Sequence, residues 1–116
     1  MNINKLRNKT YLDQHDCDPP IVATMKTLRQ ENMSEDIQNP DLKWVLYFEE
    51  DIKPTVLNWT NIQLVAQAVG ADDTDEWPGK KIELYREPNV SFGGKLVGGI
   101  RVRAAKDKGR KVKQVA

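Results

Sequence analysis

Apolar and polar residues alternate most regularly over Leu42–Glu49, and this alternation predicts a β-strand with one buried face. Lys80–Glu87 and Lys95–Ala104 alternate in the same way. Ile21–Arg29 is rich in β-branched residues and is also expected to be a strand, and a short strand at Thr55–Asn58 is expected after the turn at Glu49–Pro54. The chain therefore contains five predicted strands.

A helix is predicted between Thr60 and Gly70. Thr60 and Gln63 have the spacing of a capping box, in which each side chain bonds the other residue's amide. Trp59 and Leu64 then have the spacing of a hydrophobic staple, and Gly70 suits the left-handed end of a helix. One face of this helix is apolar, since four residues recur at helical spacing: Ile62, Val65, Ala66 and Val69.

The order strand, strand, strand, helix, strand, strand is that of the OB-fold, a small partly open Greek-key barrel. The glycine pairs Gly93-Gly94 and Gly98-Gly99 favour a barrel, because strands that coil sharply or bulge need glycine. We therefore expect a mainly β fold, a five-stranded OB-like barrel with one helix between strands 3 and 4. An open α+β sheet with one helix is the alternative. Trp44 and Trp77 lie on or beside apolar stripes and are expected in the core.

The 116 residues fit a single domain. Its expected limits are a polar segment at 1–19, the OB-like domain at 20–104 and a basic, disordered tail at 105–116. Residues 101–116 hold seven lysines and arginines against Asp107, a net charge of +6, so the rest of the chain carries −5. A basic tail on an acidic domain is typical of contact with nucleic acid, although a solvated terminus has the same composition.

The residues give little support to catalysis. His15 and Cys17 are the only histidine and the only cysteine, and they lie two positions apart in a polar segment without further ligands at metal-binding spacing. The acidic stretch 72–76 lacks the spacing and the central glycine of an EF-hand loop. We therefore expect a protein that is not an enzyme, with no cofactor and no bound metal.

Several segments together resemble a family of small, mostly unassigned bacteriophage and prophage proteins. The matching segments are Tyr11-Leu12 with His15-Asp16; Val45–Glu50 with Lys53-Pro54 and Val56–Asn58; Asp75 with Trp77 and Gly79–Tyr85; and Phe92–Lys95 with Ile100–Arg103. The resemblance covers roughly residues 11–103. Some members of this family look like OB-type proteins that bind single-stranded DNA, so the resemblance implies such an activity here.

Nucleic-acid binding is also what the exposed residues favour. In OB-folds the ligand crosses strands 2 and 3, between the loops that join strands 1 and 2 and strands 4 and 5. Basic side chains would neutralise phosphates and aromatic rings would stack on bases. The candidate residues are Lys43, Tyr47, Lys53, Tyr85, Phe92, Lys95, Arg101 and Arg103. Phe92 has an alternative role as a plug for the end of the barrel, and the arginines have one as ordinary charges on an exposed strand.

The expected partner is single-stranded DNA or RNA, with phage or host replication proteins as further partners. The alternative is a structural or adaptor protein of the phage particle that binds another protein. The N-terminus lacks the apolar segment of a signal peptide, and no later apolar run approaches the length of a membrane span. We therefore expect the protein in the bacterial cytoplasm.

Overall fold

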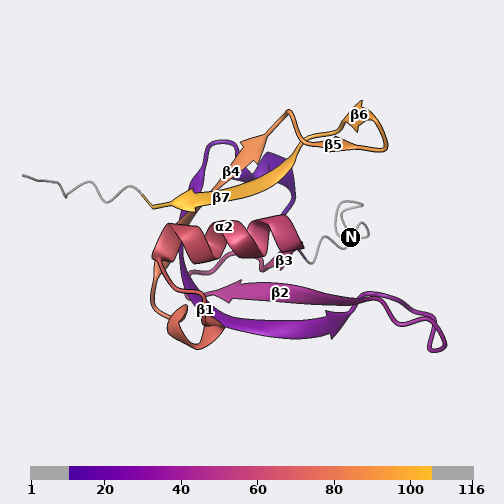
Figure 1. Cartoon of the computed structure of the whole chain (residues 1–116), viewed down its shortest axis with the longest axis horizontal. Coiled ribbons are helices and arrows are strands. Elements are labelled where there is room, and N and C mark those ends of the chain that lie inside the picture. Colours follow the sequence, from indigo (N-terminus) through magenta and orange to yellow (C-terminus); the bar gives the residue numbers. More distant parts are fainter. Residues whose placement is uncertain (1–10, 106–116) are drawn as a thin grey trace, which may run out of the picture.

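The computed structural model describes residues 11–105, and its centre is a five-stranded antiparallel sheet with one helix (Figure 1). The mainly β fold with one helix between the third and fourth strands of that sheet is confirmed. The strands lie in the order β3-β2-β1-β4-β7. Their bounds are β1 Ile21–Asn32, β2 Leu42–Phe48, β3 Thr55–Leu57, β4 Lys81–Glu87 and β7 Gly99–Ala104.

The central strand β1 is long and is shared between two neighbours. Its first residues, Ile21–Thr24, pair with β4, and its later residues, from Met25 to Asn32, pair with β2. The register with β2 shifts between Met25 and Thr27, and such a bulge bends a strand. The sheet therefore turns at β1, and β3 and β7 are its two outermost strands. No ladder joins β3 to β7 within residues 11–105.

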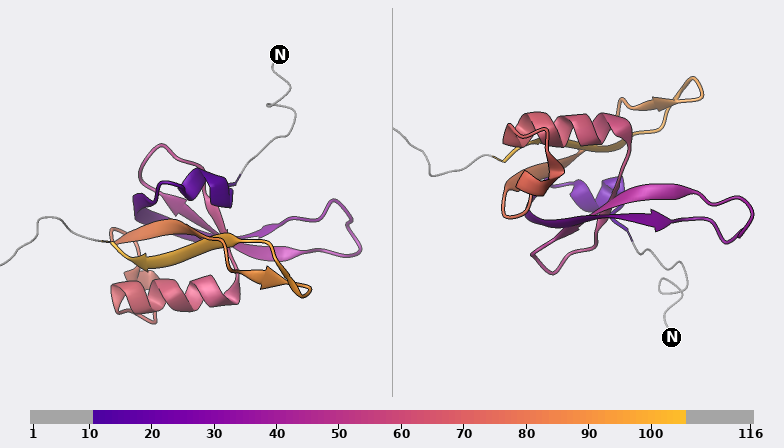
Figure 2. Two further views of the ribbon diagram at one scale, coloured as in Figure 1. Left: turned by 90° about the horizontal axis from the view of Figure 1, so that it is seen from above. Right: turned by 60° about the horizontal axis from the view of Figure 1, so that its bottom comes forward.

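The helix α2 (Trp59–Val69) lies alongside β7 and covers the core between β7 and the β2–β3 side of the sheet (Figures 1 and 2). Its predicted apolar face is confirmed, because Val65 is fully buried and Ile62, Ala66 and Val69 pack against the core. The core comprises Val65 and residues of all five strands of the sheet, among them Met25, Leu46, Leu57, Leu84 and Val102. Gly70 ends the helix at φ 69° with its amide bonded to the carbonyl of Ala66, as predicted.

The start of the helix differs from the predicted capping box. Asn58 is the N-cap, and its side-chain oxygen accepts a hydrogen bond from the amide of Asn61 at 2.8 Å. The helix therefore begins two residues earlier than a cap at Thr60 requires. Trp59 becomes the first helical residue and is 69% exposed, so the predicted staple with Leu64 is wrong. Asparagine is at least as strong an N-cap as threonine. Asn58 is used rather than Thr60 because it directly follows the end of β3 at Leu57.

Of the two tryptophans expected in the core, only one is there. Trp77 is 2% exposed, and its indole nitrogen donates to the carbonyl of Ala71 at 3.0 Å. Trp44 is 42% exposed and Leu42 is 53% exposed, so the expectation for Trp44 is wrong. Both residues lie where β1 and β2 extend as a two-stranded arm beyond the rest of the sheet (Figure 1). Leu46 and Phe48 on the same predicted face are buried, and Val45 on the opposite face is fully buried as well.

The predicted last strand is two elements. Lys95–Leu96 is β6, which pairs with β5 (Ser91–Phe92) in a separate hairpin, and β7 begins only at Gly99. Gly98 lies between them at φ 76°, a left-handed conformation that interrupts the extended chain. Leu96 is consequently 68% exposed and does not share the buried face with Val102.

Residues ahead of the expected domain boundary at position 20 belong to the packed unit. The 3-10 turn η1 (Gln14–Cys17) packs beside β4, Cys17 is fully buried, and Leu12 packs against the core. The amide of Leu12 donates to the carbonyl of Pro54 beside β3. A second 3-10 turn, η2 (Thr74–Glu76), precedes Trp77. The predicted basic tail lies outside the described residues, apart from Ala105.

Candidate functional site

Two hairpins project on the same side of the molecule and flank the start of α2 (Figure 1). One is the extended β1–β2 arm with its loop at 33–41, and the other is the short β5–β6 hairpin. They are the loops between strands 1 and 2 and between strands 4 and 5 that the sequence marked as the borders of a ligand site. Of these two hairpins, the β5–β6 hairpin lines a groove, whereas no residue of the β1–β2 arm or of its loop lines that groove.

A groove of about 520 Å³ lies beside the β5–β6 hairpin and is here called the hairpin groove. One wall is formed by β3 and the first turn of α2, and the other by the hairpin and the start of β7. Its lining residues are Leu12, Thr55, Val56, Asn58, Thr60, Asn61, Val90, Ser91, Phe92, Val97, Gly98, Gly99, Ile100 and Arg101. Two of the predicted site residues, Phe92 and Arg101, are among them.

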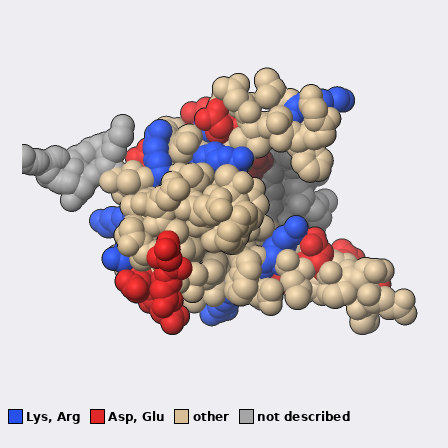
Figure 3. Space-filling model, in the orientation of Figure 1, with Lys and Arg blue, Asp and Glu red and all other residues tan. Residues whose placement is uncertain are grey.

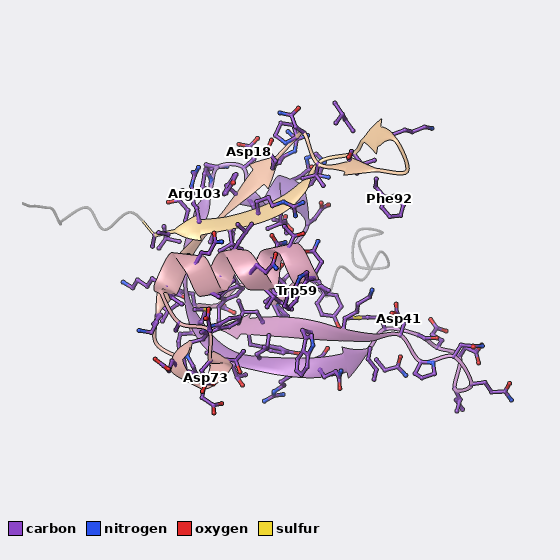
Figure 4. All side chains as sticks on the ribbon, in the orientation of Figure 1. Asp18, Asp41, Trp59, Asp73, Phe92 and Arg103 are labelled. Atoms are coloured by element: carbon purple, nitrogen blue, oxygen red, sulfur yellow. The ribbon has the colours of Figure 1, made fainter. Side chains whose placement is uncertain are left out.

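Phe92 contributes an exposed aromatic ring to the hairpin groove. It is 79% exposed, which contradicts the alternative that it plugs the end of a barrel. In Figure 4 its ring hangs from the hairpin toward the side on which Trp59 lies. Gly93 and Gly94, at φ 61° and 80°, form the tight turn that places Phe92 opposite Lys95. The hairpin thus presents a ring and an ammonium group side by side.

Arg101 lies in β7, on the same wall of the groove as the hairpin, and is half-buried. Its Nη1 donates to the carbonyl of Ile100 at 3.2 Å and to the side-chain oxygen of Asn61 at 3.5 Å. Asn61 is 4% exposed and also donates to the carbonyl of Ile100 at 3.0 Å. A guanidinium has five N–H donors, so those on Nε and Nη2 are left for a ligand as far as residues 11–105 are concerned. Asn61 thereby fixes one end of the arginine and leaves the other end available.

Gln14, which was not among the residues predicted for the site, forms hydrogen bonds at the base of the hairpin. The side-chain amide of Gln14 donates to the carbonyl of Val97 at 3.0 Å, and its oxygen accepts from Nε of Arg86 at 3.0 Å. The amides of Val97 and Gly98 both donate to the carbonyl of Val90, at 2.8 and 3.0 Å. Because Gln14 precedes the predicted domain, no local pattern connects it to a hairpin 83 residues later.

Arg103 and Tyr85 are placed together but away from the groove. The guanidinium of Arg103 lies over the Tyr85 ring, 4.3 Å from its centre, and bonds the carboxylate of Glu83. Figure 4 shows Phe92 and Arg103 toward opposite ends of the molecule. The sequence predicted one basic face from Lys95 to Arg103, but the break at Gly98 and the ion pair with Glu83 divide it.

Tyr47 also has internal partners, on the outer side of the β1–β2 arm. Its hydroxyl and that of Tyr11 both donate to the Glu31 carboxylate, the latter at 2.8 Å, and the Arg29 guanidinium lies 5.2 Å from the centre of its ring. These hydrogen bonds raise the pKa of both phenols and lower the pKa of the Glu31 carboxyl. Tyr47 and Tyr11 therefore serve to fasten the N-terminal residues to the arm.

The two predicted lysines outside the hairpin do not reach the groove. Lys43 on β2 pairs with Asp41 at 3.5 Å, with both side chains about half exposed. Lys53 is exposed in the turn between β2 and β3. Neither residue lines the hairpin groove. Of the eight predicted residues only Phe92 and Arg101 line it, and Lys95 lies opposite Phe92 on the hairpin.

His15 and Cys17 lie in different environments, one exposed and one buried. Cys17 is fully buried, which raises the pKa of its thiol to about 11, whereas His15 is exposed. A buried neutral thiol is inert. Within residues 11–105, no group of three or more histidine, cysteine, aspartate or glutamate side chains is arranged to hold a metal ion.

Comparison of the chain with protein-family models, with curated proteins and with solved structures finds no match. Among the described residues, no helix combines the length and the apolar character that crossing a membrane requires.

Proposed function

We propose that this protein binds single-stranded nucleic acid in the hairpin groove and that it does so without catalysis. The main support for this proposal is that an exposed aromatic ring, Phe92, and a guanidinium with unused hydrogen-bond donors among the described residues, Arg101, line the same groove. In this proposal Phe92 stacks on a base, Lys95 and Arg101 contact phosphates, and the β1–β2 arm and the β5–β6 hairpin flank the bound nucleic acid. A stacked base contributes about 1–3 kcal/mol and tolerates any sequence.

The strand order supports placing the fold in the OB-like class. An OB-fold pairs its first strand with both the second and the fourth, as β1 does here, and places its helix between the third and fourth strands. Closure into a barrel requires that β3 approach β7. Both strands contact α2, so they border the same helix. The bacteriophage origin, the cytoplasmic location and an association with replication proteins are part of the same proposal and rest on the resemblance described above.

The test is a fluorescence-anisotropy titration with labelled single-stranded and double-stranded oligonucleotides at two salt concentrations. We expect tighter binding of the single strand and a steep loss of affinity with salt, because phosphate contacts release counterions. Arg101→Gln should weaken binding, whereas Lys43→Gln, which removes a charge outside the groove, should have little effect. Absence of binding at low salt, or equal effects of the two variants, would overturn the proposal.

The adaptor function is the second candidate, because the β5–β6 hairpin is also apolar. Phe92, Leu96 and Val97 are 79%, 68% and 50% exposed, and adjacent exposed apolar side chains are typical of contacts with other proteins. The two candidates differ in the role of Leu96, which lies on the hairpin but does not line the groove. Leu96→Ala should leave nucleic-acid binding unchanged and should weaken capture of a protein partner.

A further inference from the structure

A second groove runs along the side of α2 that carries Ile62 and Ala66, beside Trp77, and is here called the helix groove. It has a volume of about 560 Å³ and extends from Trp59 in the first turn, past Ile62 and Ala66, to Asp72 and Thr74 beyond the end of the helix. Its floor is apolar, and Trp59 is 69% exposed. Thr60 and Asn61 of the first turn line the hairpin groove instead, and the two grooves share no lining residue.

One end of the helix groove is strongly acidic. Asp72, Asp73, Asp75 and Glu76 are all exposed, and none of them forms an ion pair within the described part of the chain. Figure 3 shows this acidic group at the lower left of the molecule, where Figure 4 labels Asp73. Four carboxylates repel a polyanion, so the occupant of this groove is not nucleic acid. The groove suits a basic chain that also carries apolar side chains.

The chain itself has such a segment outside the described residues. Residues 106–116 contain five lysines and arginines against Asp107, and Val112 and Val115 follow within that run. The segment starts close to the groove, because Ala104 pairs with Ile82, five positions from Trp77 on the groove wall. That path bounds the separation at about 23 Å, whereas eleven extended residues reach about 36 Å.

We propose that the C-terminal segment 106–116 docks in the helix groove of its own chain. Val112 and Val115 would cover the apolar floor, and the basic residues would pair with the carboxylates of Asp72–Glu76. Because the segment and the groove belong to one chain, a short connection raises the effective concentration to the millimolar range, so weak contacts suffice. This inference does not depend on the proposed function, because it concerns a different groove and is tested without nucleic acid.

The experiment uses the full chain with Ala116→Cys carrying a nitroxide, while the buried Cys17 stays unlabelled. We expect the amide NMR signals of Gln63, Gln67 and Thr74 to lose intensity at low salt because of the nearby nitroxide. The signals should recover at 1 M salt, where a Debye length of about 3 Å screens the attraction between the segment and the carboxylates. Signals of the loop at 33–41, at the far end of the β1–β2 arm, should stay unchanged.

A charge-matched pair of variants separates docking from general attraction. Asp73→Asn with Asp75→Asn and Glu76→Gln should restore the lost intensities. Glu35→Gln with Asp36→Asn and Asp41→Asn removes the same charge from the distant loop and should leave the loss in place.

Three results would each overturn the proposal. They are no intensity loss at the helix groove, an equal loss at the loop 33–41, and a loss seen only when a labelled chain is mixed with a separate isotope-enriched chain. The third result would assign the segment to the groove of a second copy.

Discussion

The guanidinium of Arg103 lies 2.5 Å from a carboxylate oxygen of Glu83 and stacks over Tyr85 on the neighbouring strand. The Glu83 side chain is only 9% exposed, and the Arg103 side chain is 42% exposed. An arginine that reads in the sequence as a phosphate contact is thus the counter-ion of a nearly buried carboxylate.

Arg103→Gln is expected to destabilise the fold by about 1–3 kcal/mol, since it leaves the Glu83 charge without its partner. The double variant with Glu83→Gln should regain most of that loss, because neither charge is then left alone. Urea unfolding of the wild type, the two single variants and the double variant measures the coupling. Equal and additive losses would show that the pair contributes nothing.

Phe92→Ala is expected to weaken single-strand binding by roughly 5- to 150-fold, which corresponds to the loss of about 1–3 kcal/mol of stacking. The melting temperature should not change, because the ring is 79% exposed. Leu96→Ala on the same hairpin is the matched control for affinity. If both variants bind like the wild type, the hairpin is not part of the nucleic-acid site.

Gly98→Ala is expected to be more destabilising than Gly94→Ala. Both positions have positive φ, 76° and 80°, so both variants incur about 1–2 kcal/mol of backbone strain. At Gly98 an added Cβ would also lie 2.3 Å from Oε1 of Gln14, whereas at Gly94 it meets nothing within 4 Å. Gln14→Ala combined with Gly98→Ala should remove the difference. Urea unfolding is the measurement, and identical losses at the two glycines would contradict the close approach.

Cys17 is expected to make stability depend on pH in the alkaline range. Its pKa is 9.0 without the fold and about 11 in the folded protein, so the folded state keeps a proton that the unfolded state releases. The resulting stabilisation is complete below pH 9 and is lost as the pH rises through about 11. The free energy of unfolding of the wild type should therefore fall more steeply across this window than that of Cys17→Ala. Parallel curves would show that the thiol is not buried as described.

Asn58→Ala is expected to cost about 1 kcal/mol of stability, the usual value for a lost N-cap. Thr60→Ala, at the cap position that the sequence pattern suggested, should cost much less, since Thr60 is exposed in the first turn of α2. Thermal unfolding of both variants decides between the two cap positions, and a larger effect at Thr60 would favour the capping box.

Local patterns were sufficient for most elements of this chain. The alternation in Leu42–Glu49, the β-branched residues after Pro20 and the left-handed Gly70 each act through their immediate neighbours, and each element lies where its pattern predicted. The helix start was off by two residues, because Asn58 and Thr60 are both good caps and only the end of β3 at Leu57 selects between them.

The sequence predicted two of the residues that line the candidate groove, but it did not separate them from the other candidates. The order of the elements predicted a site between two loops, and the groove that Phe92 and Arg101 line is bordered by only one of them, the loop between β4 and β7. Tyr47, Tyr85 and Arg103 were equally plausible from the sequence, yet each has an internal partner supplied by another strand. Gln14 was invisible, because its partners Arg86 and Val97 are more than 70 residues away.

The sequence by itself determined most of the strands, the presence of the helix and the number of charges, because backbone preference and side-chain periodicity are local properties. Only the tertiary structure decided which of those charges remain available to a ligand. An arginine on a strand is a ligand contact or an ion-pair partner according to the residue opposite it. That residue is set by the register of β4 with β7, which the sequence of either strand alone does not specify.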